Sequence, residues 1–295
     1  MISVIIPTFN RKNKLLRSLS SVMDQTFRDI EIIIIDDGST DGTENAIKSI
    51  KDDRIIFLKH KTNIGGGAAR NTGIRNAHGD YIAFQDSDDV WYKNKLEVEL
   101  NCLLLNDADI VFCKMNRIVD GESNKIFPDN YSEGFLEKGS NVHGIGTPTI
   151  LGKSEIFRDC LFDEELPRLQ ELELLIRLSE KYRIYCCDKP LMDTYFDKSN
   201  ESISGNPIKL LKASKILHEK YPMLNRQFPD TSQLIAGDLI VNSYKNNIDE
   251  SSRKEMRYLA ISIDPSIKTV LKYICTVTGI FPLINSRAAA LMKER

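Results

Sequence analysis

Two short runs of β-branched residues near the N-terminus limit the folds open to this chain of 295 residues. Ile2–Ile6 and Ile30–Ile35 are continuous apolar runs, a pattern typical of strands that are buried on both faces of a sheet. Between them, apolar residues from Leu15 to Met23 recur at helical spacing. A strand, a helix and a second strand in this order predict a parallel pair, because the helix provides the long crossover that joins parallel strands.

The same alternation continues to about residue 115. Helices are expected at Thr43–Ile50, Ala68–Asn76 and Lys95–Asn106, and strands at Ile55–Leu58, Tyr81–Phe84 and Ile110–Met115. Alternating elements predict an α/β fold with a Rossmann-like, mostly parallel central sheet and helices on both faces. Such sheets bind ligands beyond the carboxyl ends of their strands, so we expect the chemistry in the loops that follow the strands.

The pattern changes in the second half of the chain. Residues 116–150 contain many Gly and Pro residues without periodicity, which indicates an irregular stretch over or beside the site. Helical spacing returns after Asn200, at Ile208–Tyr221, Gln233–Tyr244 and Ser252–Ile261. We therefore expect an α/β domain over residues 1–204 and a mainly helical region over residues 205–295.

Composition excludes several classes of protein. With 41% hydrophobic and 28% charged residues the chain has a globular composition, and a net charge of −2 makes a nucleic-acid-binding protein a poor expectation. Residues 200–295 carry 14 Lys or Arg against 9 Asp or Glu, whereas residues 1–199 carry 26 against 33. Six cysteines without paired spacing indicate neither a zinc site nor a disulfide framework.

No targeting or membrane-spanning segment is expected. The first residues lack the charged region and long apolar region of a signal peptide, so a cytoplasmic location is the default expectation. The longest nearly apolar stretch, Ile274–Ile284, is about half as long as the ~20 residues that a transmembrane helix needs.

The first two strands are each followed by a polar loop. Pro7, Thr8, Asn10 and Arg11 bring a hydroxyl, an amide and a cation, although a strand end and a helix cap explain them as well. Residues 36–42 contain three carboxylates, and an ionised carboxylate at a strand end can accept the N–H of a nucleobase. Turn chemistry accounts for residues 39–42 but not for two adjacent aspartates at the strand exit.

The third and fourth loops are suited to ions. Gly65–Gly67 open a helix that contains Arg70, which favours an anion site, with a plain flexible loop as the alternative. Asp86, Ser87, Asp88 and Asp89 follow the fourth strand, and clustered carboxylates usually indicate a cation. Oxygen ligands suit Mg²⁺ or Mn²⁺ with substrate phosphates, and a solvated acidic turn is the alternative.

Together these loops resemble the family 2 glycosyltransferases, which have the GT-A fold. The resemblance covers roughly residues 1–200 and rests on four motifs in the same order: Ser3–Arg11, Asp36–Asp41, Asn63–Gly65 leading to Ala69–Ile74, and Asp86–Asp89. It implies a catalytic domain that binds a nucleotide-sugar donor, most often a UDP-sugar.

The resemblance also implies roles for single residues. Thr8 and Asp37 would contact the base with Arg70 nearby, and Asp86, the first residue of the DXD motif, would touch the ribose. Asp88 would bind a divalent metal, Mn²⁺ or Mg²⁺, that bridges the two phosphates. The remaining expected nucleotide-binding residues in the four loops are Pro7, Asn10, Arg11, Gly65 and Ser87.

Inverting members of the family need a carboxylate that deprotonates the acceptor hydroxyl. The matching stretch here is Leu166–Leu178, in which Glu171 occupies the position of the usual aspartate. The additional methylene moves the carboxylate oxygens by about 1.5 Å, while the reference pKa of ~4.3 stays close to the ~3.9 of aspartate. A second interpretation of Glu171 and Glu173 is an acidic first helical turn that complements the helix dipole.

Two further residues are candidates for phosphate or acceptor contacts. His143 lies in the irregular stretch, and Lys198 lies near the end of the expected catalytic domain. A lone histidine and a solvated loop lysine are the plain alternatives.

The expected function is a metal-dependent, inverting glycosyltransferase. It would transfer a hexose or N-acetylhexosamine to a hydroxyl of a growing glycan on a lipid or protein carrier. A sugar nucleotidyltransferase is disfavoured, because the chain lacks a glycine-rich loop with Arg and Lys after the first strand. A non-catalytic nucleotide-sugar-binding partner stays open, because Glu171 departs from the family pattern.

The C-terminal region has three expected roles: packing on the catalytic domain, forming a homo-oligomer, or resting on the inner face of a membrane. The sequence favours packing or oligomerisation, because no dense stripe of Lys and Arg accompanies a large apolar face.

Overall fold

The computed structural model describes residues 1–119, 122–196, 206–245, 248–278 and 285. The chain divides into two compact units. The first unit comprises Met1–Lys138, Gly144–Glu164 and Gln170–Asn200, and the second comprises Gly139–His143, Glu165–Leu169 and Glu201–Arg295. The boundary expected between residues 204 and 205 lies outside the described residues.

The first unit is built on one large sheet. Its main path has the order β3 (Ile55–Lys59), β2 (Ile30–Asp36), β1 (Ile2–Thr8), β4 (Tyr81–Phe84), β9 (Ile150–Lys153), β6 (Ile110–Val119), β10 (Ile184–Phe196) and β5 (Val90–Trp91). The first four strands are parallel, and β6 and β10 run in the same direction, whereas β9 and β5 are antiparallel to their neighbours. The expected mostly parallel sheet is confirmed.

Strand register brings the exits of the parallel strands together. Thr8 at the end of β1 lies opposite Asp36 at the end of β2, and Ile5 lies opposite Phe84 at the end of β4. Because all these strands point the same way, their polar exit loops share one edge of the sheet.

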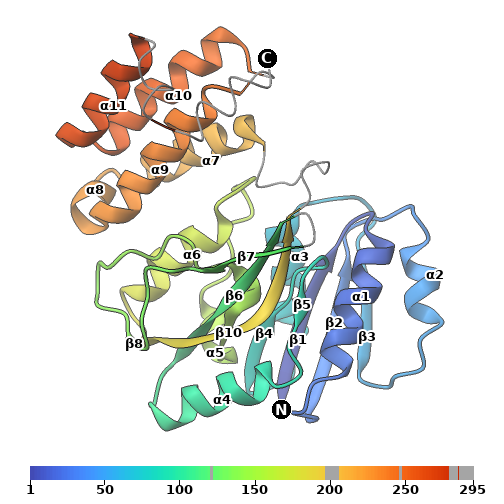
Figure 1. The fold of residues 1–295 in the computed structure, drawn as a ribbon. Coiled ribbons are helices and arrows are strands. Elements are labelled where there is room, and N and C mark those ends of the chain that lie inside the picture. The colour runs from blue at the N-terminus through green and yellow to red at the C-terminus, as the bar shows by residue number, and fades with distance from the viewer. Residues whose placement is uncertain (120–121, 197–205, 246–247, 279–284, 286–295) are drawn as a thin grey trace. The chain divides into compact units, whose positions relative to one another are not determined.

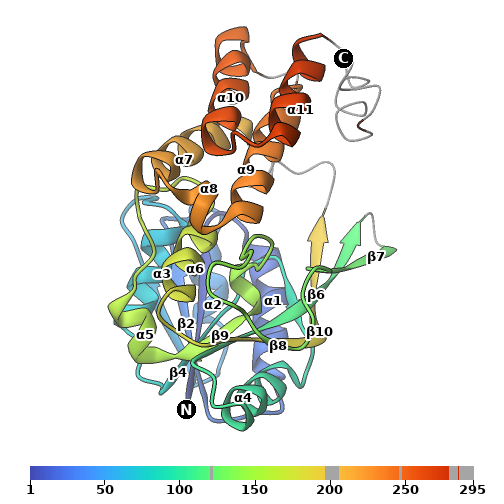
Figure 2. The same cartoon turned by 90° about the vertical axis from the view of Figure 1, so that its left-hand side faces the viewer.

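Helices cover both faces of the sheet, as Figures 1 and 2 show. On one face, Ile2, Val4 and Ile6 of β1 join a single core cluster with residues of α1 (Lys12–Met23), α2 (Thr43–Lys48) and α4 (Lys95–Leu105). On the other face lie α3 (Gly66–Arg75), α5 (Ser154–Asp159) and α6 (Gln170–Ser179), with the ring of Phe157 edge-on to Phe84. Burial of alternate β1 residues on both faces explains its continuous apolar run.

The expectation of an irregular stretch over residues 116–150 was wrong for its first part. Strand β6 continues to Val119 and pairs antiparallel with β7 (Glu122–Phe127). This hairpin projects from the sheet edge and carries mostly polar residues, so it lacks the apolar runs that indicated the other strands. Beyond it follow β8 (Gly134–Phe135) and a short 3₁₀ helix at Thr147–Thr149.

Several other elements were also missing from the expectations. Strands β5, β9 and β10 and helix α5 were not predicted. Strand β10 spans 13 residues, and its pairing with β6 shifts register on both sides of Pro190. A proline inside a strand interrupts the apolar pattern that would have indicated it.

The second unit contains the C-terminal helices: α7 (Pro207–Lys220), α8 (Leu224–Gln227), α9 (Pro229–Asn242), α10 (Glu250–Ile263) and α11 (Ile267–Val277). Three of them were predicted, whereas α8 and α11 were not. Asp249 and Ser266 cap α10 and α11 by accepting hydrogen bonds from backbone N–H groups. No helix in the described part of the chain is long and apolar enough to cross a membrane. All six cysteines are free thiols, as expected.

Packing between α3 and the sheet depends on a glycine. A Cβ on Gly73 would lie 2.5 Å from Cγ2 of Ile5 and 2.9 Å from Cδ1 of Ile35. We predict that Gly73→Ala lowers the free energy of unfolding by about 1–3 kcal/mol, because an overpacked core must shift its side chains. Urea unfolding of the full chain measures this change.

Gly237→Ala in α9 is the matched control for that substitution. Its Cβ would meet only Nζ of Lys272, at an ordinary contact distance of 3.7 Å. Alanine favours a helix by about 1 kcal/mol over glycine, so this variant should be neutral or more stable. Equal stability changes for both variants would contradict the overpacking argument.

Candidate active site

Residues of α1 and its N-cap contact the acidic turn Asp86–Asp89, which follows β4. Nη1 of Arg11 lies 2.8 Å from Oδ2 of Asp88, and Nη2 of Arg17 donates to the carbonyl of Asp88 at 2.9 Å. Oγ of Ser18 donates to the carbonyl of Asp86 at 2.9 Å. The exits of β1 and β4, 77 residues apart, are therefore joined by direct contacts.

Negative charge is concentrated in this turn. Burial, with Asp86 adding repulsion, raises the pKa of Asp88, although Arg11 opposes the shift. Burial and the neighbouring carboxylates Asp86 and Asp88 raise the pKa of Asp89 well above its ordinary value. Added positive charge at this edge would relieve the repulsion.

Asp37, expected to contact a base, binds the loop after β3. Its Oδ1 accepts the N–H of Ile64 at 3.0 Å, and its Oδ2 accepts the N–H of Gly65 at 2.8 Å. Oδ1 also lies 2.8 Å from Nδ1 of His60, whose Nε2 lies 3.0 Å from Oγ1 of Thr72. Asp37 therefore orders the backbone that leads into α3, a role that sequence reasoning missed.

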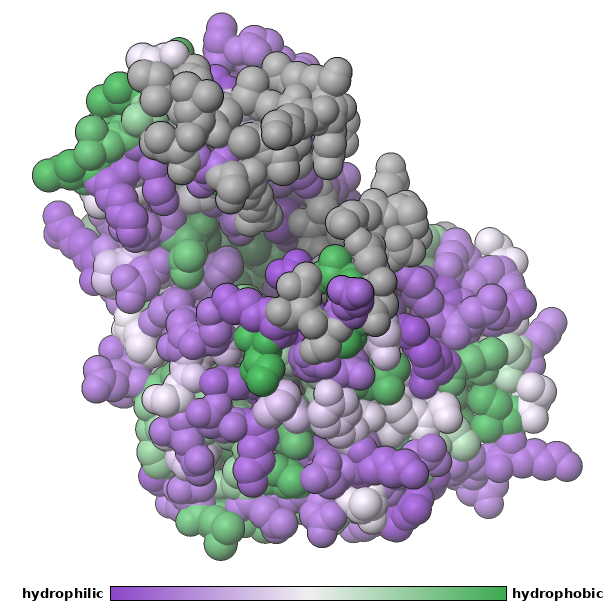
Figure 3. Space-filling view, in the orientation of Figure 1, coloured by the Kyte–Doolittle hydropathy of each residue, from purple (hydrophilic) through white to green (hydrophobic). Residues whose placement is uncertain are grey.

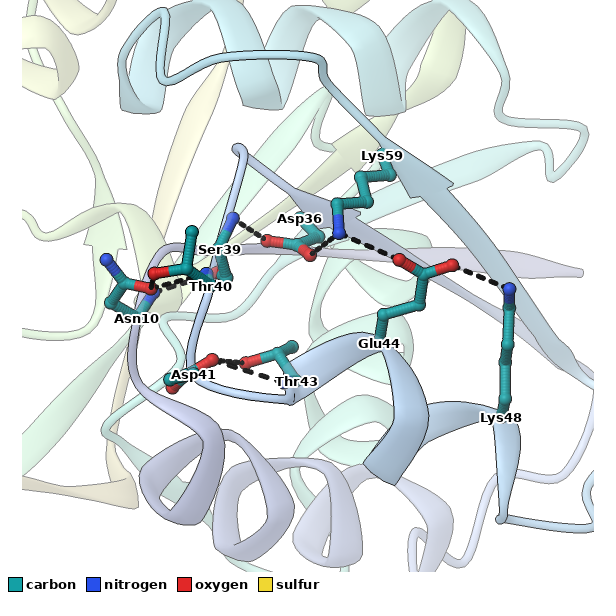
Figure 4. Close-up of polar contacts among 9 residues, drawn as sticks. All are labelled: Asn10, Asp36, Ser39, Thr40, Asp41, Thr43, Glu44, Lys48 and Lys59. Atoms are coloured by element: carbon teal, nitrogen blue, oxygen red, sulfur yellow. Dashed lines mark hydrogen bonds and ion pairs between the residues drawn. The ribbon is translucent and has the colours of Figure 1, made fainter.

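The loop after β2 is tied to the loop after β1, as Figure 4 shows. Asn10, whose φ is 50°, donates its N–H to Oγ of Ser39 and accepts the N–H of Thr40, both at 2.8 Å. The buried carboxylate of Asp36 accepts the N–H of Ser39 at 2.8 Å and lies 3.8 Å from Nζ of Lys59. Asp36 and Asn10 thus shape the edge of the site.

Four buried polar atoms near this edge have no hydrogen-bond partner within the described residues: Oγ1 of Thr8, Oδ2 of Asp36, Nε of Arg70 and Oε1 of Gln85. Oγ1 of Thr8 is buried and makes no hydrogen bond within the described residues. Buried hydroxyls are nearly always hydrogen-bonded, so an orphan at a strand exit fits a group that a ligand completes. This observation is independent of the family resemblance that indicated Thr8.

Arg70 connects three elements. Its Nη2 lies 2.6 Å from Oδ1 of Asp86, and its Nη1 donates to Oε1 of Gln170 at 3.4 Å. A Cβ on Gly67 would lie 3.0 Å from Nε2 of Gln170, so the absence of a side chain lets the amide approach the start of α3. The β4 exit, α3 and the first residue of α6 are therefore linked beside Glu171.

The two acidic residues of α6 are in different environments. Glu173 is fully buried, and its Oε2 lies 2.8 Å from Nη2 of Arg177. Glu171 is partly exposed, and its carboxylate makes no hydrogen bond or ion pair with any described residue. Glu173 therefore has a structural role, and Glu171 is the more accessible of the two carboxylates.

His143 and Lys198 are the two remaining predicted residues. In the second unit, Nε2 of His143 lies 3.8 Å from Oδ2 of Asp238 in α9. The backbone N–H of His143 donates to Oδ1 of Asn141. Lys198 lies outside the described residues. Gln170 had been assigned no role, because an amide at a helix start gives no chemical signal in a sequence.

The acidic turn fits a divalent cation that is shared with a ligand. No group of three His, Cys, Asp or Glu side chains in the described part of the chain could hold a metal ion by itself. Mg²⁺ and Mn²⁺ commonly bind through one or two carboxylates together with substrate phosphates. Asp88 offers carboxylate oxygens beside Asp86 and Asp89, and a cation would offset the repulsion among them, so Asp88 suits that arrangement.

Curated relatives carry glycosyltransferase names. The chain is 32% identical over 267 residues to an uncharacterised glycosyltransferase of Rickettsia conorii, covering 86% of this chain and 42% of that protein. It is 29% identical over 233 residues to WfaP of Escherichia coli, named a UDP-Glc:α-D-GlcNAc-diphosphoundecaprenol β-1,3-glucosyltransferase, covering 74% and 85% of the two chains. The chain spans about two fifths of the length of the Rickettsia conorii and Rickettsia felis relatives.

Solved structures share the fold. TarS of S. aureus in complex with UDP matches 99% of this chain and 88% of its own, with a TM-score of 0.67 and 19% identity. The mannosyltransferase PcManGT of Pyrobaculum calidifontis, in complex with GDP-Man and Mn²⁺, matches 99% and 83%, with a TM-score of 0.60 and 15% identity. These likenesses support the GT-A fold expected from the sequence.

A family match covers most of the first unit and all the loops that form the acidic edge. The family described as "Glycosyl transferase family 2" matches residues 3–164, more than half of the chain. This match includes Thr8, Asp37, Arg70 and Asp88. The chain therefore belongs to the family 2 glycosyltransferases.

Proposed function

We propose that this protein transfers a hexose or N-acetylhexosamine from a UDP-sugar to a hydroxyl of a lipid-linked glycan, with inversion at the anomeric carbon. The main support is a chain of contacts in which Arg70 bonds both Asp86, in the turn after β4, and Gln170, the first residue of α6. Glu171 follows Gln170 directly in the sequence. WfaP, whose name gives a UDP-glucose donor and a diphosphoundecaprenol-linked acceptor, supports this class of substrates.

The exit loops would bind the nucleotide. The unpartnered Oγ1 of Thr8 offers a hydrogen bond at the end of β1, and Asp37 holds the backbone of Gly65 where α3 begins. Arg70 and Arg11 bring two guanidinium groups to the acidic turn, and both can also meet phosphate oxygens. Within this arrangement, Asp86 is the proposed ribose contact.

Asp88 would hold the divalent cation together with the diphosphate of the donor. When bound, the ion supplies positive charge that stabilises the leaving diphosphate. Arg11 contacts the same carboxylate, so we expect the guanidinium and the ion to compete for Asp88.

Glu171 is the proposed general base. As the acceptor oxygen forms a bond to the anomeric carbon, the bond from that carbon to the diphosphate breaks and UDP leaves. The proton of the acceptor hydroxyl passes to the carboxylate of Glu171, which has no protein partner to displace within the described residues. A partly exposed position at the start of α6 gives an acceptor access to it.

A panel of nucleotide sugars tests the function as a whole. The purified protein is incubated with each donor, with and without a synthetic GlcNAc-diphosphoprenol, in Mn²⁺, in Mg²⁺ and in chelator. Glycosylated lipid and released UDP are then measured. Transfer from one UDP-sugar in metal supports the proposal. Metal-dependent UDP binding, with neither sugar transfer to a hydroxyl acceptor nor hydrolysis of the donor, would instead indicate a non-catalytic binding partner.

Removal of the proposed base gives the first prediction for this site. Glu171→Gln should reduce transfer by at least ~100-fold, the range for loss of a general base, because the amide cannot take the proton. UDP binding, measured by calorimetry, should stay within about twofold of the wild type, since Glu171 does not contact the donor loops directly.

Glu173→Gln in the same helical turn is the control. Glu173 is buried against Arg177, so this variant should lower the melting temperature while the folded protein keeps most of its transfer rate. If Glu171→Gln retained near wild-type transfer, the base would lie elsewhere.

Loss of the metal ligand gives a different result. Asp88→Asn should abolish the stimulation of UDP binding by Mn²⁺, because a neutral amide is a poor ligand for a hard cation. Calorimetric titration with UDP in metal and in chelator measures this difference. Asp53→Asn, at an exposed position away from the turn, should leave the stimulation unchanged. Full stimulation in Asp88→Asn would remove Asp88 as the ligand.

A further inference from the structure

Helix α11 in the second unit has its apolar side turned outward. Ile267, Leu271 and Ile274 are 80%, 55% and 47% exposed, whereas Thr269 and Thr276 on the opposite side are 0% and 4% exposed. A helix of a globular protein normally buries its apolar stripe and exposes its polar side. Figure 3 shows the resulting apolar patch over α11.

The exposed side chains form one continuous stripe. Ile267, Leu271, Ile274 and Val277 follow each other at intervals of four, three and three residues, which places them on one side of the helix. We call these four residues the apolar face. Contiguous exposed apolar surface of this kind is uncommon unless it serves an interaction.

Cations and tyrosines border the apolar face on the α10 side. A pocket of about 400 Å³ between α10 and α11 is lined by Glu250, Lys254, Arg257, Tyr258, Tyr273 and Val277. Tyr258, one of the lining residues, is 72% exposed. Two cations against one carboxylate make this pocket suitable for an anionic group.

One cation borders the other side of the apolar face. Lys268 lies on α11, and its Nζ donates to Oε1 of Gln233 in α9 at 2.8 Å. Nζ of Lys272 is turned toward α9 instead, since a Cβ on Gly237 would lie 3.7 Å from it. The apolar face therefore lies between Lys268 of α11 and the two cations of α10, and the sequence shows no dense basic stripe because two of these three cations come from α10.

We propose that the apolar face docks on a membrane surface that contains anionic lipids, with the pocket receiving a lipid phosphate group. Apolar residues flanked by Lys and Arg and accompanied by exposed tyrosines are the composition of helices that lie in the plane of a membrane interface. This inference rests on α10 and α11 alone and goes beyond the proposed sugar transfer.

Sedimentation with vesicles tests the docking. The full chain is mixed with vesicles of phosphatidylcholine, or of phosphatidylcholine with phosphatidylglycerol, and the bound fraction is measured. Wild-type protein should bind the anionic vesicles at least about tenfold more strongly than the neutral ones. The double variant Leu271→Ser/Ile274→Ser should lose at least about tenfold in binding, and Lys254→Glu should weaken binding to the anionic vesicles only.

Leu105→Ser is the matched control, because Leu105 on α4 is 85% exposed in the first unit and should have no effect on vesicle binding. Hydrolysis of the donor needs no membrane and should be unchanged in the double variant, which separates failure of docking from failure of the proposed function. Three results would overturn the inference: no vesicle binding by the wild type, a dimer that the double variant converts to monomer, or a large fall in its melting temperature.

Discussion

The site depends on the parallel register of β1, β2 and β4. Their carboxyl ends lie at one edge of the sheet, so three loops that are far apart in the chain meet there. The loops contact one another directly, since Arg11 meets Asp88 and Asn10 meets Ser39 and Thr40, and Arg70 of α3 also reaches Asp86. A shift in this register would separate all of these pairs at once.

Negative charge is in excess in the turn after β4. Burial raises the pKa values of Asp88 and Asp89, and repulsion among Asp86, Asp88 and Asp89 adds to the shift. Arg11 and Arg70 offset part of this repulsion and also connect the turn to α1 and α3. In the proposed function the same guanidinium groups would meet the phosphates of the donor beside the cation.

The second unit follows a different principle. Its helices α7, α9 and α10 bury apolar residues, among them Leu217, Leu239 and Met256, whereas α11 buries two threonines and exposes its aliphatic residues. Hydrophobic burial within the described chain therefore does not account for the sequence of α11. In the proposed docking, a membrane surface would supply the missing apolar environment, and the cations of α10 and α11 would supply the attraction to it.

Sequence alone determined the α/β class, the parallel strands β1 to β4 and the four polar exit loops, because buried runs, helical spacing and local turn chemistry are written in neighbouring residues. It did not reveal the β6–β7 hairpin, whose mostly polar residues lack an apolar run, or strand β10, which Pro190 interrupts. Only the tertiary structure distinguished Glu171 from Glu173, placed Asp37 against Ile64 and Gly65, and turned the apolar face of α11 outward. Those outcomes depend on which distant residue lies opposite, and packing in three dimensions decides that.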